Sequence, residues 1–419
     1  MPKHYFSYVI TMLSAVKRRN RQAVSVHYLC TPWTVDYGPW TIDNMNYYII
    51  AGEASGDLHG SNLIKELHKL DATANIRCWG GEKMQAAGAT LVKHYRDLAF
   101  MGFVEVITNL RTIFKNLSFC KEDILEHKPD VLVLIDYPGF NLRIAKWAKE
   151  NNIKVIYYIS PQVWAWKENR VKMMKQCIDE MLVILPFEKA YYKNKWNWDV
   201  QYVGHPLVEE VERATRETET LLPGKPIDAS KKIIALLPGS RKQEILKKLP
   251  VMLEVSKAFT DYQFIVAKAP GLDASFYDEL LQPFSNVSYV NNQTYALLQQ
   301  STAALVTSGT ATLETALFGV PEVVCYKGNE ISYQIAKRLV NIKYISLVNL
   351  IMDDEVVKEL IQHEMNVLNL GTELTNILPG SSKREEQLIQ YQRLKEKLQA
   401  GGHASAKAAK AIIDFLHQQ

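Results

Sequence analysis

The feature that most constrains the fold is a series of short, continuously apolar runs that begins at Asn46. Such runs are typical of parallel strands buried on both faces. Longer stretches with helical periodicity separate them, as in βαβ units. The predicted strands are residues 47–51, 130–136, 154–160, 180–186, 232–238, 262–269, 287–291, 303–309 and 321–327. The sequence therefore predicts an α/β protein built on parallel sheets.

The alternation breaks once, near residues 205–231, where the chain is polar and contains three prolines. This composition indicates a linker. A chain of 419 residues is long enough for two or three domains. We therefore expect an α/β domain on each side of the linker, with small-molecule sites between the domains and at the carboxyl ends of the strands.

Composition is ordinary for a soluble globular protein, with 47% apolar and 22% charged residues. The five cysteines form no CxxC pair, which argues for a reducing compartment and against a zinc site. DxD and HExxH motifs are absent, so no metal is expected. Most of the formal charge of +4 lies in residues 1–44, so the nearly neutral remainder does not indicate nucleic-acid binding.

Residues 1–44 lack clear periodicity, and their apolar stretch precedes the basic cluster, the reverse of a signal peptide. Met45 stands directly before the first predicted strand. Our hypothesis is that residues 1–44 are an upstream or disordered extension and that Met45 is the natural start. The sequence has no run of about 18 apolar residues that could span a membrane.

Carboxylates stand at two strand ends before the predicted linker. Asp136 follows "VLVLI", where it could act as a general base or simply cap a helix or turn. The stretch "NYYIIAGEASGDLHG" (46–60) has the strand–loop–helix form of a phosphate loop, but Glu53 and Asp57 would repel phosphate. His205, at the junction, is more simply a structural histidine.

Two loops after the linker have the residues of an anion site. In "LLPGSR" (236–241), Gly239 permits close approach, Ser240 and helix amides could bind an anion, and Arg241 could clamp phosphate. An ordinary strand–turn–helix with a surface arginine explains this motif equally well.

In "TSGTATLE" (307–314), Ser308, Gly309 and Thr310 would present hydroxyls and amides at a positive helix end. Glu314, one turn on, could accept hydrogen bonds from ribose hydroxyls. A capping box is the alternative. Together the two loops favour a nucleotide diphosphate site.

Residues 98–121 have basic residues nearby and place five apolar residues at helical spacing, namely Phe103, Ile107, Leu110, Phe114 and Leu117. The simplest interpretation is a core-facing helix. The alternative is an interfacial helix that dips into a bilayer.

With these pieces in place, the chain resembles the lipid-A-disaccharide synthase family, glycosyltransferase family 19. The resemblance rests on "AGEASGD", "MGFVEV", "IDYPGFN", "SPQVWAW", "LLPGSR" and "SGTATLE", in order across about residues 46–350. It implies a GT-B architecture, two Rossmann-like domains facing across a cleft, with no cofactor or required metal. The implied parts are an acceptor and membrane-facing domain (45–208), a UDP-sugar domain (209–395) and a C-terminal helix (396–419). That last helix would pack on the N-terminal domain or on a partner subunit.

The resemblance also implies the reaction. A 2,3-diacylglucosamine passes from its UDP derivative to the 6-hydroxyl of 2,3-diacylglucosamine 1-phosphate, giving UDP and a β-1,6-linked disaccharide. Asp136 would be the base, Arg241 and the helix ends after Gly239 and Ser308 would hold the diphosphate, and Glu314 the ribose. Asn349 matches a family position near the nucleotide sugar. The expected substrate-binding residues are Glu53, Ser55, Gly56, Asp57 and Asn141.

The acylated substrates imply a cytoplasmic enzyme bound peripherally to the inner membrane through residues 98–121, and the family suggests a homodimer. Alternative functions are a GT-B enzyme on soluble UDP-N-acetylglucosamine, a UDP-sugar 2-epimerase and a non-catalytic UDP-sugar binding protein. An NAD-dependent dehydrogenase is less consistent, because no GxGxxG follows a strand.

Overall fold

The computed structural model describes residues 45–98, 110–217, 221, 228, 230–269, 271–340 and 342–418. The predictions for residues 1–44 and for the segment 99–109 lie outside the described residues. Within the described part of the chain, no helix has both the length and the apolarity needed to cross a membrane.

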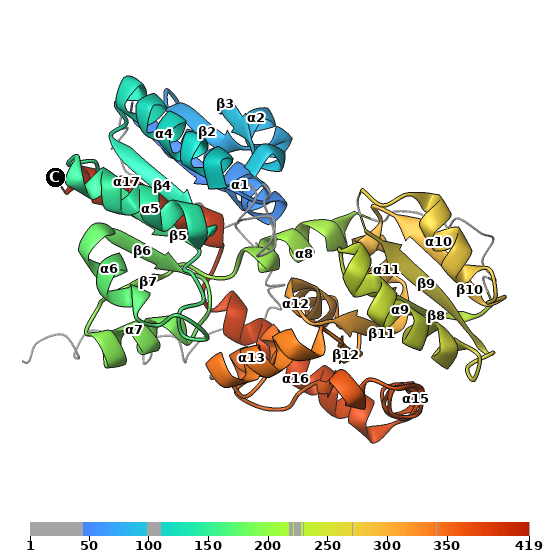
Figure 1. The fold of residues 1–419 in the computed structure, drawn as a ribbon. Helices are drawn as coiled ribbons and strands as arrows, with labels where there is room; N and C mark the ends of the chain where they lie inside the picture. The colour runs from blue at the N-terminus through green and yellow to red at the C-terminus, as the bar shows by residue number, and fades with distance from the viewer. Residues whose placement is uncertain are drawn as a thin grey trace, which may run out of the picture. The chain divides into compact units, whose positions relative to one another are not determined.

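The first half of the chain forms a seven-stranded sheet whose paired strands are all parallel (Figure 1). Its order is β3-β2-β1-β4-β5-β6-β7. The strands are β1 (Asn46–Ala51), β2 (Asn75–Gly80), β3 (Thr90–His94), β4 (Val131–Ile135), β5 (Val155–Tyr158), β6 (Glu180–Val183) and β7 (Gln201–Tyr202). The strand order reverses between β1 and β4, which lie side by side.

The second half forms a six-stranded parallel sheet in the order β10-β9-β8-β11-β12-β13. Its strands are β8 (Lys232–Leu237), β9 (Tyr262–Lys268), β10 (Val287–Asn291), β11 (Ser301–Thr307), β12 (Glu322–Tyr326) and β13 (Lys358–Ile361). Here the order reverses between β8 and β11. The predicted α/β class with two parallel sheets is confirmed.

Helices connect the strands in both halves. Those of the first half are α1 (Ala54–Leu70), α2 (Glu82–Ala86), α4 (Leu110–His127), α5 (Pro138–Glu150), α6 (Arg170–Cys177), α7 (Glu188–Trp196) and α8 (Pro206–Arg216). Those of the second half are α9 (Lys242–Ser256), α10 (Ala274–Leu281), α11 (Thr294–Gln299), α12 (Thr310–Leu317), α13 (Glu330–Leu339), α14 (Leu347–Met352), α15 (Val367–Asn376), α16 (Ser382–Gln399) and α17 (Ala404–His417). Short 3-10 turns cover Tyr95–Leu98 and Gln362–Glu364.

Each sheet is buried on both faces, as continuous apolar runs require. All five residues of β4 are fully buried, and alternate residues enter two separate cores. The last helix, α17, returns to the first sheet, where Ala408 and Ile412 share a core with Leu63 and Leu67 of α1 (Figure 1). The first core therefore includes the end of the chain.

The prediction of a linker over 205–231 is wrong for its first part, because residues 206–216 form α8. The His205 ring accepts a hydrogen bond from the Leu207 amide and caps the helix, and Pro206 supplies a favourable first-turn φ. Leu207, Val208 and Val211 make its buried face. Pro206 and the charged residues that follow it suggested a linker, whereas they form the first turn and much of the outer face of an amphipathic helix.

Strand order also predicts where ligands bind. In open parallel sheets the crevice forms at the carboxyl ends of strands where the order reverses. The loops leaving β1 and β4 contain Glu53 and Asp136, and those leaving β8 and β11 contain Gly239 and Ser308. The motifs singled out in the sequence therefore follow the four strands at the two reversal points.

Candidate active site

Asp136 directly follows β4, and hydrogen bonds to its backbone groups hold it in place. Asp136 and Tyr137 have φ of 44° and 48°, in the left-handed region that costs free energy for non-glycine residues. The Asp136 carbonyl accepts hydrogen bonds from Asn141 Nδ2, at 2.8 Å, and from the Tyr157 hydroxyl. The Asp136 amide donates to the Tyr158 carbonyl at 3.1 Å. These contacts fix the direction in which the Asp136 side chain leaves the strand.

The Asp136 carboxyl lies in an environment that disfavours its charge. Burial, together with the nearby Glu53 carboxylate, raises the pKa of Asp136 to about 6. A carboxylate with a pKa near neutrality is a stronger base than an ordinary aspartate. A carboxyl with such a pKa could act as a general base.

Asp136 lines a cavity of about 550 Å³. Of the residues singled out in the sequence, Ser55, Gly56, Asp136 and Thr310 line this cavity, together with His205. Much of the remaining wall is apolar and comes from Ile159, Val163, Trp166, Ile184, Leu185, Leu207 and Leu347. A polar reacting group beside an apolar wall suits an amphiphilic substrate.

The loop after β1 shows why its sequence is rich in small residues. A Cβ at Gly52 would lie 2.3 Å from the Tyr137 ring, so only glycine fits beneath that ring. Glu53 is half-buried at the start of α1; burial raises the pKa of its carboxyl, and the positive charge of Arg241 opposes this shift. The Glu53 carboxyl is therefore influenced by the charge of Arg241, in the loop after β8.

Asp57 has a different position. Its buried carboxylate accepts hydrogen bonds from the amides of Gly81, Lys83 and Met84, at 2.7, 3.2 and 3.1 Å. These amides belong to the start of α2, where a carboxylate is favourable. Asp57 thus joins α1 to α2.

The loops after β8 and β11 share a second cavity of about 290 Å³. Its lining includes Gly239, Ser240, Ser308, Gly309, Thr310 and Glu314. Gly239 and Gly309 have φ of 116° and 147°, a region that L side chains rarely adopt. The predicted grouping of the two motifs is therefore present in the geometry.

Other side chains tie these loops in place. The Ser308 hydroxyl donates to the Ile345 carbonyl at 2.8 Å, and the Glu314 carboxylate accepts from the Tyr295 hydroxyl at 2.8 Å. Burial raises the pKa of Glu314. Arg241 is exposed at the start of α9, with its guanidinium 3.6 Å from the Glu244 carboxylate.

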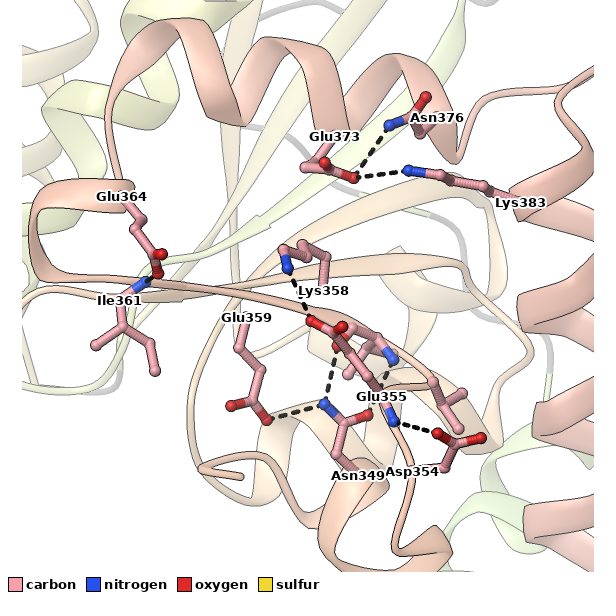
Figure 2. Close-up of polar contacts among 12 residues, drawn as sticks. Asn349, Asp354, Glu355, Lys358, Glu359, Ile361, Glu364, Glu373, Asn376 and Lys383 are labelled. Carbon is pink, nitrogen blue, oxygen red and sulfur yellow. Dashed lines mark hydrogen bonds and ion pairs between the residues drawn. The ribbon is translucent and has the colours of Figure 1, made fainter. Parts of the chain in front are cut away.

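Asn349 and Asn141 are buried; the Asn349 amide is engaged at both ends, whereas Asn141 donates through Nδ2 and its Oδ1 has no hydrogen-bond partner. Figure 2 shows the Asn349 side chain directed at Glu359, 3.0 Å from Nδ2 to Oε1. Asn349 also exchanges hydrogen bonds of 2.9 Å with the backbone of Val357. Asn141 Nδ2 donates to the carbonyls of Ile135 and Asp136. Both asparagines shape the loops on which candidate binding residues stand.

Glu188, which stands in the stretch "LPFEKAYY" (185–192), is not among the site residues predicted from the sequence. Glu188 is buried, lines the Asp136 cavity, and accepts hydrogen bonds from Trp164 Nε1 and the Leu185 amide, at 3.1 and 3.0 Å. Burial raises its pKa to about 7. The Trp164 contact links "LPFEKAYY" to "SPQVWAW", a pairing that neither motif shows alone.

Two histidines line the same cavity. Burial lowers the pKa of His59 to about 4 and of His205 to about 3, so both rings are neutral near pH 7. His205 is also the α8 cap, in agreement with its structural interpretation. Within the described ranges, no group of three or more His, Cys, Asp or Glu side chains could hold a metal ion.

Comparison with solved structures supports the architecture. A glycosyltransferase of kitacinnamycin matches with a TM-score of 0.62 at 15% identity, covering 88% of this chain and 99% of that chain. UDP-GlcNAc 2-epimerase from Neisseria meningitidis, bound to UDP-GlcNAc, matches with a TM-score of 0.58 at 15% identity over 90% of this chain and 100% of that chain. At these identities the likeness shows the GT-B type of fold.

Sequence comparison is more specific. The family model described as lipid-A-disaccharide synthetase matches residues 47–413. Lipid-A-disaccharide synthase of Geobacter metallireducens is 39% identical over 381 residues, which is 90% of this chain and 98% of that protein. The enzyme of Syntrophus aciditrophicus is 38% identical over 371 residues, 87% of this chain and 96% of its own length. The chain therefore belongs to the lipid-A-disaccharide synthetase family.

Proposed function

We propose that this protein transfers 2,3-diacylglucosamine from its UDP derivative to the 6-hydroxyl of 2,3-diacylglucosamine 1-phosphate. The products are UDP and the β-1,6-linked lipid A disaccharide 1-phosphate. Family membership supports this reaction. The observation that carries the mechanism is Asp136, a carboxyl with a pKa of about 6, beside a partly apolar cavity.

Asp136 is the proposed base. Inversion at the anomeric carbon requires removal of the proton from the attacking hydroxyl on the face opposite the leaving group. The left-handed backbone and the Asn141 hydrogen bond hold Asp136 at the strand end, ready to accept that proton. Ser55 and Gly56 line the same cavity and would bind the acceptor sugar, with Glu53 close to the base.

The loops after β8 and β11 are the proposed diphosphate site, which assigns nucleotide binding to residues 209–395. Backbone amides at Ser240 and Thr310 and the guanidinium of Arg241 would stabilise charge that develops on the departing UDP. Glu314, with one carboxylate oxygen bound to Tyr295, has a second oxygen for a ribose hydroxyl.

Three residues of the predicted site receive indirect roles in this proposal. Asp57, Asn141 and Asn349 have polar groups engaged by α2, by the carbonyls after β4 and by β13. They would keep the loops in position without direct contact to the sugars.

Peripheral binding to the cytoplasmic face of the inner membrane is part of the proposal, because both substrates are acylated. On α4, Phe114 is 62% exposed and Phe119 43% exposed, with exposed Arg111 and Lys115 close in sequence. An apolar and basic surface suits an anionic bilayer. Co-sedimentation with anionic vesicles should fall for Phe114→Ser and be unchanged for Leu368→Ser, a 78% exposed residue of α15. Assembly as a homodimer, measured by sedimentation velocity, belongs to the same proposal.

Mass spectrometry of the product from defined substrates tests the function. Purified protein is given UDP-2,3-diacylglucosamine or UDP-N-acetylglucosamine, which lacks the long acyl chains, each with diacylglucosamine 1-phosphate. A tetraacyl disaccharide phosphate from the diacylated donor is expected. Turnover of UDP-N-acetylglucosamine alone would instead support a GT-B enzyme on a soluble UDP-sugar.

A further inference from the structure

A buried lysine lies behind the two loops that the proposed function assigns to diphosphate binding. Lys248 belongs to α9 and is only 3% exposed. Its ammonium donates a hydrogen bond to the hydroxyl of Thr307, the last residue of β11. The same ammonium lies 3.9 Å from the Glu244 carboxylate. It also lies 3.3 Å from the position that a Cβ at Gly239 would occupy.

The position of this lysine is unusual for a helix of this kind. The neighbouring core residues Ile245, Leu249 and Met252 are apolar and completely buried. Lysine is almost never fully buried without a partner, because its charge loses hydration. Burial accordingly lowers the pKa of Lys248, while Glu244 raises it. An apolar residue would fill this core position at a smaller cost, so the amine calls for a reason beyond packing.

The contacts of Lys248 reach both loops. Thr307 begins "TSGTATLE", and Glu244 contacts Arg241 of "LLPGSR" at 3.6 Å. A chain of charged and hydrogen-bonded groups therefore crosses from the end of β8 to the end of β11, in the order Arg241, Glu244, Lys248 and Thr307. Lys248 is the member of this chain that is buried and joins the two strands.

We propose that Lys248 is a positioning residue for the leaving diphosphate: it holds the two strand-end loops together and supplies a buried positive charge behind them. This inference rests on the proposed function, since it takes these loops to be the diphosphate site. Thr307 and Glu244 connect the lysine to the two loops. Its positive charge adds to the positive potential at the starts of α9 and α12. In a poorly hydrated position such a charge is screened less than one at the surface.

Calorimetric titration of the full chain with UDP and with uridine separates this role from a general structural one. Lys248→Met keeps most of the length of the side chain and removes the charge and the donors. We expect the Kd for UDP to rise about tenfold, as the loss of one partly screened charge interaction implies. The Kd for uridine, which lacks phosphates, should stay within about twofold. Lys247→Met, an exposed neighbour on α9, should change neither value.

A second pair of variants keeps the inference testable if Lys248→Met fails to fold. Thr307→Val removes the hydroxyl that Lys248 contacts and should weaken UDP binding in the same way, whereas Thr307→Ser keeps a hydroxyl and should leave UDP binding unchanged. Equal loss of UDP and uridine binding, or unchanged UDP binding in Lys248→Met, would overturn the inference. If the wild type still makes the disaccharide, either of these results overturns the inference but leaves the proposed function intact. If the wild type binds no UDP, both the inference and the proposed function lose their basis.

Discussion

The two sheets share a topology but differ in chemistry at the points where their strand order reverses. The first presents the carboxyls of Glu53 and Asp136 at the ends of β1 and β4. The second presents glycines and hydroxyls at the ends of β8 and β11, with the buried ammonium of Lys248 behind them. The same crevice position is therefore acidic in one sheet and suited to anions in the other.

This contrast indicates how a single fold can divide a transfer reaction. A base works best where its charge is disfavoured, because burial raises its pKa. A leaving diphosphate needs the opposite, namely preorganised donors and positive charge. Variants that exchange or weaken these properties therefore test the division directly, and we order them by their expected effect on the transfer rate.

The largest effect is expected for Asp136→Asn. Loss of the general base should lower kcat by about 10³-fold, within the range typical of this role. UDP binding, assigned to the other sheet, should be unchanged. Asp130→Asn is the matched control, because Asp130 precedes the opposite end of the same strand. Near wild-type transfer by Asp136→Asn in a steady-state assay would show that the base lies elsewhere.

Gly309→Ala tests the second region. The φ of 147° at Gly309 is unfavourable for alanine, while no atom lies within 4 Å of the added Cβ, so the penalty comes from the backbone. A distortion of about 1–3 kcal/mol at the start of α12 should weaken UDP binding by about tenfold or more. Gly371→Ala, in α15 without positive φ, should leave UDP affinity unchanged and raise the melting temperature slightly. Unchanged UDP affinity in Gly309→Ala would separate this loop from the nucleotide site.

The sequence predicted the central part of both sheets well. Each of the nine predicted runs contains or overlaps a strand, because parallel strands buried on both faces need continuous apolar residues. Within the described residues, the strands without a predicted run are β2, β3, β7 and β13. β3 and β7 are partly exposed, and β2 contains Asn75 and Arg77, so their apolar signal is interrupted. In β13, only four residues long, Lys358 and Glu359 obscure the pattern.

Candidate site residues were predictable where the backbone alone determines their place. Asp136 and Gly309 follow buried strands, so their location at the sheet edge follows from the fold. Hydrogen-bond partners that lie outside the motif cannot be predicted in this way. Asp57 contacts α2 and Asn349 contacts β13, and neither partner is visible in its motif. Lys248 escaped notice because a lysine in an amphipathic helix normally faces solvent.

Glu53→Gln tests the electrostatic coupling within the first region. Transfer should decline as pH falls through about 6, where Asp136 becomes protonated and cannot accept a proton. Burial is the main cause of this raised pKa, and the Glu53 charge adds to it. Removing that charge should move the acidic limb of the kcat/KM profile to lower pH. The KM for the acceptor should rise about tenfold, an effect typical of a lost charge-assisted hydrogen bond, with UDP affinity little changed. An unmoved acidic limb would mean that Glu53 does not influence the base.

The smallest effect on rate is expected for Glu188→Gln. This variant should change kcat by no more than about twofold, because Glu188 is part of the cavity wall and has no proposed role in the reaction. Its effect on stability is clearer. The folded-state pKa of about 7 lies above the ordinary value of 4.5, so between these values the native state binds more protons than the unfolded state. The free energy of unfolding should therefore fall as pH rises from 4.5 to 7, by on the order of 2 kcal/mol. Glu188→Gln cannot titrate and should show a shallower fall in urea unfolding at pH 5 and pH 8. A shallower fall would show that a buried carboxyl of the first region lowers stability as it ionises. If the free energy of unfolding falls equally with pH in wild type and variant, Glu188 does not cause the fall.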